Sequence, residues 1–272
     1  MKNKKLLAIL IFLIMTVITY VFLYRKTEAP KLNGVPLIVE DKEFVIKDSV
    51  IVAPQDNFIN SNSSISTKYK IINRDLVTPI DAKNQQKAVL LTIDDGPSKR
   101  TKEILDILNK HNAKAIFFIN GINEKHNKGV IEETYKEGFA IGNHTWSHID
   151  LKKQKDVVTI EKEINRNTEL IKNLTKTPPL FFRAPYGESN PYVRKLVKED
   201  GMIFMDWSGA AKDWEKSTIE KDVFINNAIL NLHSGSILLI HEHPWSVANL
   251  DGLLTAIEEK GYTFIDPKDI IE

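Results

Sequence analysis

Two adjacent carboxylates, Asp94 and Asp95, follow an unbroken apolar and β-branched run at residues 89–93. Such a run predicts a strand covered on both faces, and the following Gly96-Pro97 predicts a turn. In α/β folds, ligands bind at the carboxyl ends of parallel strands. Since neighbouring strand residues point to opposite faces, both acids can address one site only if the chain bends, and Gly96-Pro97 is expected to supply the bend. An Asp pair that caps a helix starting near Ser98 is the simpler alternative.

Two histidines four residues apart, His144 and His148, follow a strand predicted at residues 139–141. At this spacing they lie on one face of a helical turn and can bind one metal ion, although an isolated pair also fits capping or packing. Together with Asp95 they would leave a zinc-type ion open to water. The chain has no cysteine, so any metal must be held by His and carboxylate.

Arg183 follows another predicted strand, at residues 180–182. A guanidinium binds a carboxylate through paired donors, so Arg183 is a candidate counter-ion for a site that holds several acids. Pro185 and Gly187 predict a tight loop that could direct a backbone N–H at a bound oxygen. A plain turn is the alternative interpretation of this loop.

The last two chemical clusters are Asp213-Trp214 and the pair His241 and His243. An apolar run at residues 237–240 ends in His241, which favours an acid–base role because His titrates near neutrality. His241 and His243 share the same strand phase. Periodicity therefore does not choose between them.

The chain has 272 residues, and 37 Lys and Arg nearly balance 36 Asp and Glu, so no charge argument favours a nucleic-acid partner. Residues 6–24 form an uncharged, mostly apolar run that is long enough to span a bilayer. A cleaved signal peptide has a shorter apolar region and a small-residue cleavage site, for which only Ala29 is nearby. We expect residues 1–26 to be an uncleaved anchor, with the rest outside the cytoplasm in either case.

Residues 27–86 predict a stalk with short strands at 35–39 and 43–46 and a polar linker at 55–70, without chemistry of its own. From residue 87 to 272, strands alternate with helices, which predicts an α/β domain with a parallel sheet, open or closed into a barrel. Strands are predicted at 89–93, 115–119, 139–141, 180–182, 202–205, 237–240 and 262–265. Helices are predicted at 99–111, 157–174, 191–199, 217–232 and 247–260.

In chain order, these clusters resemble the five motifs of the polysaccharide deacetylase family (NodB-homology domain, carbohydrate esterase family 4). The motifs are Thr92-Ile93-Asp94-Asp95-Gly96, His144-Thr145-x-x-His148, Arg183-x-Pro185-Tyr186, Asp213-Trp214 and Leu239-x-His241. The resemblance covers about residues 87–272 and neither the anchor nor the stalk. It implies a distorted (β/α) barrel and metal-dependent removal of acetyl groups from N-acetylated sugars.

The resemblance also implies a role for each motif residue. Asp95, His144 and His148 would hold a divalent metal, usually Zn²⁺. Asp94 would be the general base and His241 the general acid. The supporting roles would be as follows: Asp213 orients His241, Arg183 supports Asp94, the Tyr186 backbone N–H contributes to an oxyanion hole, and Trp214 and Leu239 line the acetyl pocket.

The sequence departs from the family pattern in two places. Ile93 stands where Phe is more usual, and Glu242-His243 follows His241 where the family often has Asp. Neither change removes a ligand or a catalytic group. The Leu239-x-His241 register favours His241 over His243 as the acid.

We therefore expect a monomeric, membrane-anchored N-acetylglucosamine deacetylase that acts on a cell-wall glycan outside the cytoplasm. Peptidoglycan is the first-choice substrate, chitin-like oligomers the second and acetylated xylan the third. A protein that binds glycan without turning it over is the alternative from another class. No nucleic-acid partner is expected.

Overall fold

The computed structural model describes residues 67–84 and 86–271. Three predicted features lie outside these residues: the anchor at residues 1–26, the strands at 35–39 and 43–46, and most of the polar linker. Among the described residues, no helix has the length and apolar character needed to cross a membrane.

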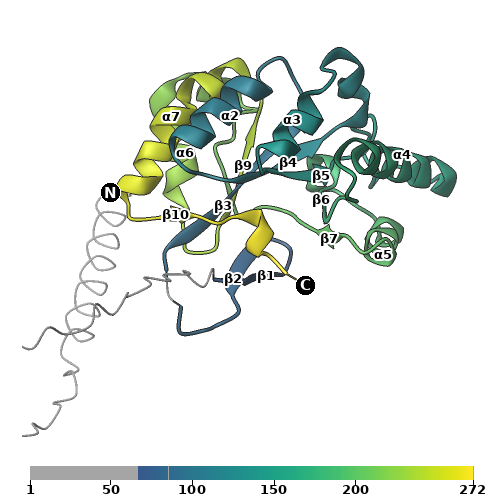
Figure 1. Cartoon of the computed structure of the whole chain (residues 1–272), viewed down its shortest axis with the longest axis horizontal. Helices are drawn as coiled ribbons and strands as arrows, with labels where there is room; N and C mark the ends of the chain where they lie inside the picture. Colours follow the sequence, from purple (N-terminus) through teal and green to yellow (C-terminus); the bar gives the residue numbers. More distant parts are fainter. Residues whose placement is uncertain (1–66, 85, 272) are drawn as a thin grey trace, which may run out of the picture. The chain divides into compact units, whose positions relative to one another are not determined.

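The described chain is built on an eight-stranded sheet whose ladders are all parallel (Figure 1). The strands follow the order β7-β6-β5-β4-β3-β9-β8, and β10 pairs with β3 off this path. Their bounds are β3 Ala88–Gly96, β4 Ala115–Ile119, β5 Ala140–Asn143, β6 Phe181–Phe182, β7 Ile203–Phe204, β8 Gly209–Ala210, β9 Ile237–His241 and β10 Thr263–Phe264. The predicted parallel α/β sheet is confirmed, and all seven predicted strands are present, β4 with its predicted bounds and the others with different ends.

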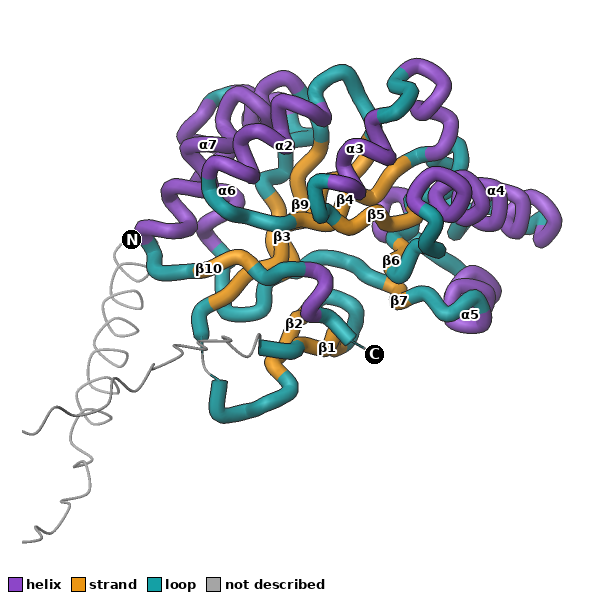
Figure 2. Tube along the Cα trace, in the orientation of Figure 1, coloured by secondary structure: helices purple, strands orange, loops and turns teal. Residues whose placement is uncertain are grey.

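The sheet is curled but not closed (Figure 2). Within the described residues, no ladder joins β7 to β8, the two ends of the strand order. Both of these strands have two residues, so they offer few backbone groups for a further ladder. The distorted barrel expected from the resemblance is therefore a half-barrel.

Six α-helices of the described chain connect the strands. They are α2 Thr101–Lys110, α3 Val130–Lys136, α4 Val157–Thr175, α5 Pro191–Glu199, α6 Lys221–Leu230 and α7 Pro244–Glu259. Short 3-10 turns lie at Gly121–His126, Pro185–Gly187, Lys216–Ile219 and Pro267–Asp269. The predicted helix at 217–232 is split between one of these turns and α6, while α3 and β8 were not predicted.

The core explains why the central strands form where they do. Every residue of β3 from Ala88 to Asp94 is buried, as predicted for a strand covered on both faces. Val89, Leu91 and Ile93 pack in a cluster with residues of α2 and α7, whereas Ala88 and Leu90 belong to a second cluster. The alternation of the strand thus fills two separate apolar layers.

A small antiparallel hairpin, β1 (Tyr69–Ile72) and β2 (Leu76–Pro79), contributes to the second layer. Tyr69 and Val77 are buried there together with Leu90. The Val77 backbone N–H also donates to the carbonyl of Gly235 over 2.8 Å. These residues lie in the stretch predicted as a stalk, and the boundary predicted at residues 86/87 stays a prediction.

Candidate metal-dependent active site

The two adjacent acids reach one pocket because β3 carries a bulge. Asp94 pairs with Phe118 and Gly96 with Ile119 on β4, so Asp95 is an extra residue in the ladder. Asp95 has φ 69°, a left-handed conformation that turns its side chain out of the strand alternation. The bend predicted at Gly96-Pro97 therefore begins one residue earlier, at Asp95 itself.

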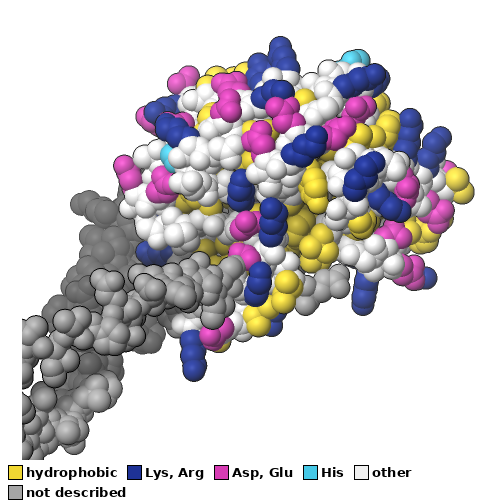
Figure 3. All heavy atoms as spheres, viewed as in Figure 1, with side chains coloured by type: hydrophobic (Ala, Val, Ile, Leu, Met, Phe, Trp, Pro, Cys, Tyr) yellow, Lys and Arg dark blue, Asp and Glu magenta, His cyan; other side chains and the backbone are white. Residues whose placement is uncertain are grey.

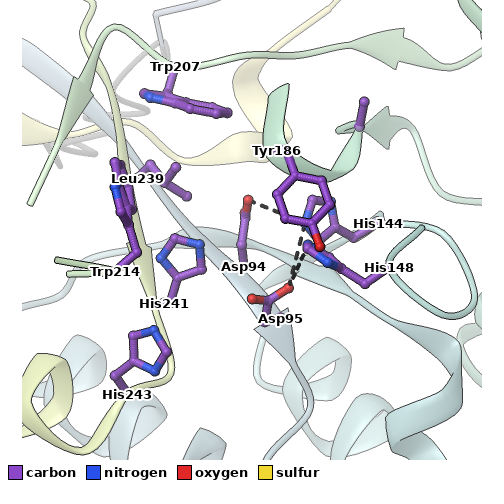
Figure 4. Close-up of a pocket in the computed structure, with 11 residues that line it drawn as sticks. Asp94, Asp95, His144, His148, Tyr186, Trp207, Trp214, Leu239, His241 and His243 are labelled. Carbon is purple, nitrogen blue, oxygen red and sulfur yellow. Dashed lines mark ion pairs between the residues drawn. The ribbon is translucent and has the colours of Figure 1, made fainter. Parts of the chain in front are cut away.

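Asp95, His144 and His148 form a cluster that fits a divalent metal ion. One ligand atom from each lies within 4.8 Å of the other two. Asp95 Oδ1 is 3.3 Å from His148 Nε2 and 3.7 Å from His144 Nε2 (Figure 4). This buried oxygen has no hydrogen-bond partner among the described residues, as a carboxylate reserved for a cation would.

The imidazole of His144 is oriented toward the cluster. Its Nδ1 lies 2.8 Å from the carbonyl oxygen of Arg183, which can only accept, so Nδ1 is the donor and Nε2 is left for the metal. Burial lowers the pKa of His144 below its ordinary value. A neutral imidazole is the form that binds metal.

The two histidines are not on a helical turn, which corrects the geometry expected from their spacing. β5 ends at Asn143, and residues 144–148 form a loop with φ 68° at Thr145 and φ 61° at His148. The loop folds back so that the His144 and His148 ring centroids are 5.0 Å apart.

Asp94 is buried beside the fully buried Arg183. Arg183 Nη1 donates to Asp94 Oδ1 and to Thr92 Oγ1, each over 2.8 Å, and Nη2 donates to the carbonyl of Asp206. The guanidinium also lies over the ring of Phe118, 4.3 Å from its centroid. Arg183 is thus a counter-ion beneath the site, and Asp94 Oδ2 remains directed at the cluster, 3.7 Å from His144 Nε2.

His241 lies on the other side of the two acids from His144 and His148 (Figure 4). It pairs with Asp94 in the β3–β9 register. Its Nδ1 donates to Asp213 Oδ1 over 2.7 Å, and its backbone N–H donates to Asp213 Oδ2 over 2.6 Å. Ser246 Oγ donates to the same Oδ2, so the fully buried Asp213 is fixed by three hydrogen bonds.

The charge state of this pair follows from its contacts. Burial alone would lower the pKa of His241, but the hydrogen bond and charge of Asp213, with the charges of Asp94 and Asp95, raise it above its ordinary value. Burial would raise the pKa of Asp213, and His241 and Ser246 hold it below its ordinary value. An ionised Asp213 next to a protonated His241 suits proton donation.

These contacts favour His241 over His243 as the general acid. The His243 ring has no hydrogen bond or ion pair among the described residues, and it stacks between His241 and Trp245. Burial lowers the pKa of His243. His241 is therefore the histidine whose ring is oriented by the buried Asp213 carboxylate and whose pKa that carboxylate raises.

These side chains line one cavity of about 500 Å³. Its lining residues are Asp94, Asp95, His144, His148, Ala184, Tyr186, Trp207, Trp214, Leu239, His241 and His243. Tyr186 and Trp214 are large apolar side chains that stay exposed at 63% and 48%. The ten residues to which the resemblance assigns a role all lie in or directly behind this cavity, and the oxyanion role of the Tyr186 backbone N–H stays a prediction.

Trp207 was missed by the sequence reasoning, although a signal for it exists. It follows the strand predicted at residues 202–205, as the other pocket residues follow theirs. Its ring sits where a side chain at Gly187 would be, because a Cβ there would lie 2.8 Å from the indole. Gly187, with φ 67°, is therefore required both for its backbone conformation and for this wall of the pocket.

An open parallel α/β sheet whose strand ends carry an Asp-His-His cluster, a buried Asp–Arg pair and an Asp–His pair is consistent with the class of metal-dependent hydrolases. Comparison with known proteins gives the family. A sequence profile described as "Polysaccharide deacetylase" matches residues 81–205. The chain belongs to the polysaccharide deacetylase family.

Two curated relatives show the range of the similarity. A peptidoglycan-N-acetylglucosamine deacetylase of Bacillus cereus is 31% identical over 195 residues, which cover 69% of this chain and 90% of that protein. One of Listeria monocytogenes is 27% identical over 242 residues, which cover 86% of this chain and 50% of that protein. The chain thus spans about half the length of this longer relative.

Solved structures agree with the fold. A peptidoglycan N-acetylglucosamine deacetylase in complex with a substituted N-oxidanyl-benzamide is 33% identical with a TM-score of 0.62, over 66% of this chain and 86% of that one. A CE4 family pseudoenzyme from Bacillus anthracis is 27% identical with the same TM-score, over 66% and 63%. The family therefore contains both active and inactive members of this shape.

Proposed function

We propose that the protein is a metal-dependent deacetylase that hydrolyses the N-acetyl group of N-acetylglucosamine-type residues in a cell-wall glycan, with peptidoglycan as the first-choice substrate. One observation carries the proposal: the Asp-His-His cluster, the Arg183-supported Asp94 and the Asp213-supported His241 face the same cavity. This is the full set of groups that amide hydrolysis needs: water activation, oxyanion stabilisation and a proton for a poor leaving group.

Asp95, His144 and His148 would hold the ion, and zinc is the metal we propose because two imidazoles and one carboxylate are ligands that it prefers. A bound divalent ion would lower the pKa of water and polarise the acetyl carbonyl. Arg183 donates to Asp94 Oδ1, and the other oxygen of Asp94, Oδ2, can accept the proton of the attacking water. The Arg183 side chain is held in this position because it also donates to Thr92 Oγ1 and to the Asp206 carbonyl.

His241 supplies the proton for the departing amine. Asp213 holds Nδ1–H, so Nε2 is the nitrogen free to donate into the cavity. Asp94 and His241 act from neighbouring strands, opposite each other in register. This register supports a base and an acid that reach one scissile amide from neighbouring strands.

The substrate class rests on the relatives and on the rim of the cavity. Several relatives at about 30% identity act on peptidoglycan N-acetylglucosamine by name. Tyr186 and Trp214 present exposed aromatic rings at the cavity, and aromatic rings bind the apolar faces of sugars. We also propose that residues 6–24 keep the enzyme at the outer side of a membrane, where such a polymer is found.

A glycan-binding protein without turnover is the second candidate, because the B. anthracis structure belongs to a pseudoenzyme of the same shape. In this chain, the metal-binding cluster, the base and the acid are all present and mutually oriented. This arrangement favours catalysis over binding alone.

Acetate release tests the proposal. The purified protein is incubated with N-acetylated peptidoglycan, a chitin oligomer and acetylated xylan, each with and without a chelator. The proposal expects acetate from peptidoglycan, loss of release with chelator and recovery with Zn²⁺. Tight glycan binding without acetate would support the non-catalytic candidate, and release from another polymer would change the substrate.

A further inference from the structure

The two histidines proposed to bind the metal begin and end a loop whose backbone is strained at two residues. We call residues 144–148 the histidine loop. Thr145 and His148 both have positive φ, which L-residues avoid because Cβ approaches the backbone too closely. Contacts from outside the loop must therefore keep the histidines in place.

Glu163, in the second turn of α4, makes the most direct of these contacts. Its carboxylate accepts the backbone N–H of Ser147 over 2.8 Å and the Ser147 hydroxyl over 2.7 Å. Its backbone carbonyl accepts the N–H of Trp146 over 2.9 Å. One helix residue thus binds two consecutive loop residues that lie between the metal ligands.

Asn167 lies one turn further along the same face of α4. It interrupts the buried apolar stripe formed by Ile160, Ile164 and Ile171, where an apolar residue would be expected. Its amide donates to the carbonyl of Ile119 and to Asn143 Oδ1, each over 2.9 Å.

Asn143 connects Asn167 with the histidine loop. Asn143 Oδ1 accepts the N–H of Thr145 over 2.8 Å, and Asn143 Nδ2 donates back to the Ile164 carbonyl of α4. Asn143 and Asn167 are both fully buried. Asn167 is therefore linked through Asn143 to Thr145, the first residue of the histidine loop with a positive φ.

Arg166 is the third residue on this face of α4 that contacts the histidine loop. Its guanidinium lies 3.5 Å from the centroid of the Trp146 ring. Gly121 leaves room for this arrangement, since a Cβ there would lie 2.5 Å from the Trp146 ring and 2.7 Å from Asn167 Oδ1. Positions 163, 166 and 167 share one helix face, and all three support the loop.

We propose that helix α4 sets the spacing of the metal-binding histidines, with Glu163 and Asn167 as positioning residues for His144 and His148. The inference rests on the metal site of the proposed function and goes beyond it. A carboxylate at 163 matches the two donors of Ser147. A glutamine there matches them as well, because its oxygen accepts the N–H and its nitrogen donates to the hydroxyl.

The test measures metal binding rather than turnover. Glu163→Ala, Glu163→Gln and a control, Glu169→Ala, are compared with the unmodified protein. Glu169 lies on the same helix, is largely exposed and, within the part of the chain that the structure describes, forms an ion pair only with Lys172. Zn²⁺ affinity is measured by competition with a chelator, and the absorption spectrum of bound Co²⁺ reports the ligand geometry. Thermal unfolding checks that each variant is folded.

We expect Glu163→Ala to bind Zn²⁺ about 10–100-fold more weakly, as for other residues that orient metal ligands, and to change the Co²⁺ spectrum. Glu163→Gln and Glu169→Ala should match the unmodified protein. If Glu163→Ala lowers only the unfolding temperature and binds both ions normally, the inference is wrong and the metal site stands. If the unmodified protein does not bind Zn²⁺, the proposed metal site fails and the inference with it.

Discussion

Asp94 and Asp95 are chemically identical neighbours, and their different surroundings favour different proposed roles. The Asp94 side chain is 3% exposed and bonded to Arg183, whereas that of Asp95 is 40% exposed and faces two imidazoles from the bulge. A general base needs a carboxylate oxygen that is not a metal ligand. In Asp94 we assign this role to Oδ2, because Arg183 binds Oδ1. The assignment of roles therefore comes from position alone.

Asp94→Asn tests this assignment. The amide cannot accept a proton in the reaction, so kcat should fall by about 10²–10⁴-fold. Metal content should stay close to that of the unmodified protein, measured by elemental analysis after gel filtration. In Asp95→Ala and His144→Ala, by contrast, the metal should be lost together with activity. Full metal occupancy in both of these variants would contradict the ligand assignment.

Asp213→Asn tests the acid. His241 must be protonated to donate, so activity is lost as pH rises through its raised pKa, and this gives the alkaline limb of the pH–rate profile. Without the negative charge of Asp213, the pKa of His241 falls, and the limb should move about 1–3 units toward lower pH. An unchanged alkaline limb in the pH profile of kcat would show that this pair does not set it.

His241→Ala and His243→Ala separate the two candidate acids. His241→Ala should keep the metal, lose most turnover and lose the alkaline limb, because the oriented donor is gone. His243→Ala should be close to the unmodified protein in kcat, since the His243 ring has no hydrogen bond within the described chain. The reverse pattern would place the acid two residues further along.

At the residue scale, strand-end position and residue type were enough to single out the two acids, Arg183 and the histidines of the pocket. Tyr186, Trp214 and Leu239 were assigned only through the family resemblance. Glu163, Asn167 and Ser246 were not predicted, because their partners are distant in sequence and come together only through the packing of α4 and α7. The break in the apolar stripe at Asn167 was the one local signal of this kind. The choice between His241 and His243 also needed the structure, since both share one strand phase.

At the scale of elements, segments with a clear apolar or periodic run were predictable, whereas two short elements without one, β8 and α3, were not. In the central strands and in α4, the spacing of apolar residues fits only one type of secondary structure. Helix α5 was predicted with its observed bounds. Strand β8 has two residues, Gly209 and Ala210, and α3 has seven. Such elements are held by their neighbours rather than by local preference. The bulge at Asp95 was missed as a bulge because nothing in the β3 pattern marks an extra residue.

Close packing at β5 gives a prediction for stability. A Cβ at Gly142 would lie 2.5 Å from the Phe118 ring, which is fully buried. Gly142→Ala should therefore cost about 1–3 kcal/mol of unfolding free energy, from overpacking. Gly209→Ala is the matched control, because its Cβ would meet atoms only at 3.5 Å and beyond. Equal unfolding midpoints in denaturant for the two variants would contradict this account of the strand.

For the whole molecule, the surface carries no large area of one charge sign on the face in Figure 3, where Lys and Arg alternate with Asp and Glu over the helices. This agrees with the nearly balanced composition. Neither this face nor the composition therefore gives a charge argument for a nucleic-acid partner.

The topology prediction belongs to this scale as well. A chain starting at residue 27 should stay in solution and keep its activity, because the site lies within the described residues. The full chain should sediment with membranes. A mature protein that begins after Ala29, found by N-terminal sequencing, would show that residues 1–29 are a cleaved signal.

Acetate release from N-acetylated peptidoglycan by the full chain tests the central claim most directly. The measurement compares protein loaded with Zn²⁺, protein treated with chelator and the metal-loaded Asp94→Asn variant. The account predicts release by the first alone, with about 10²–10⁴-fold less from the variant at equal metal content. Equal release from chelated and loaded protein, or no release from any N-acetylated glycan despite bound Zn²⁺, would contradict it.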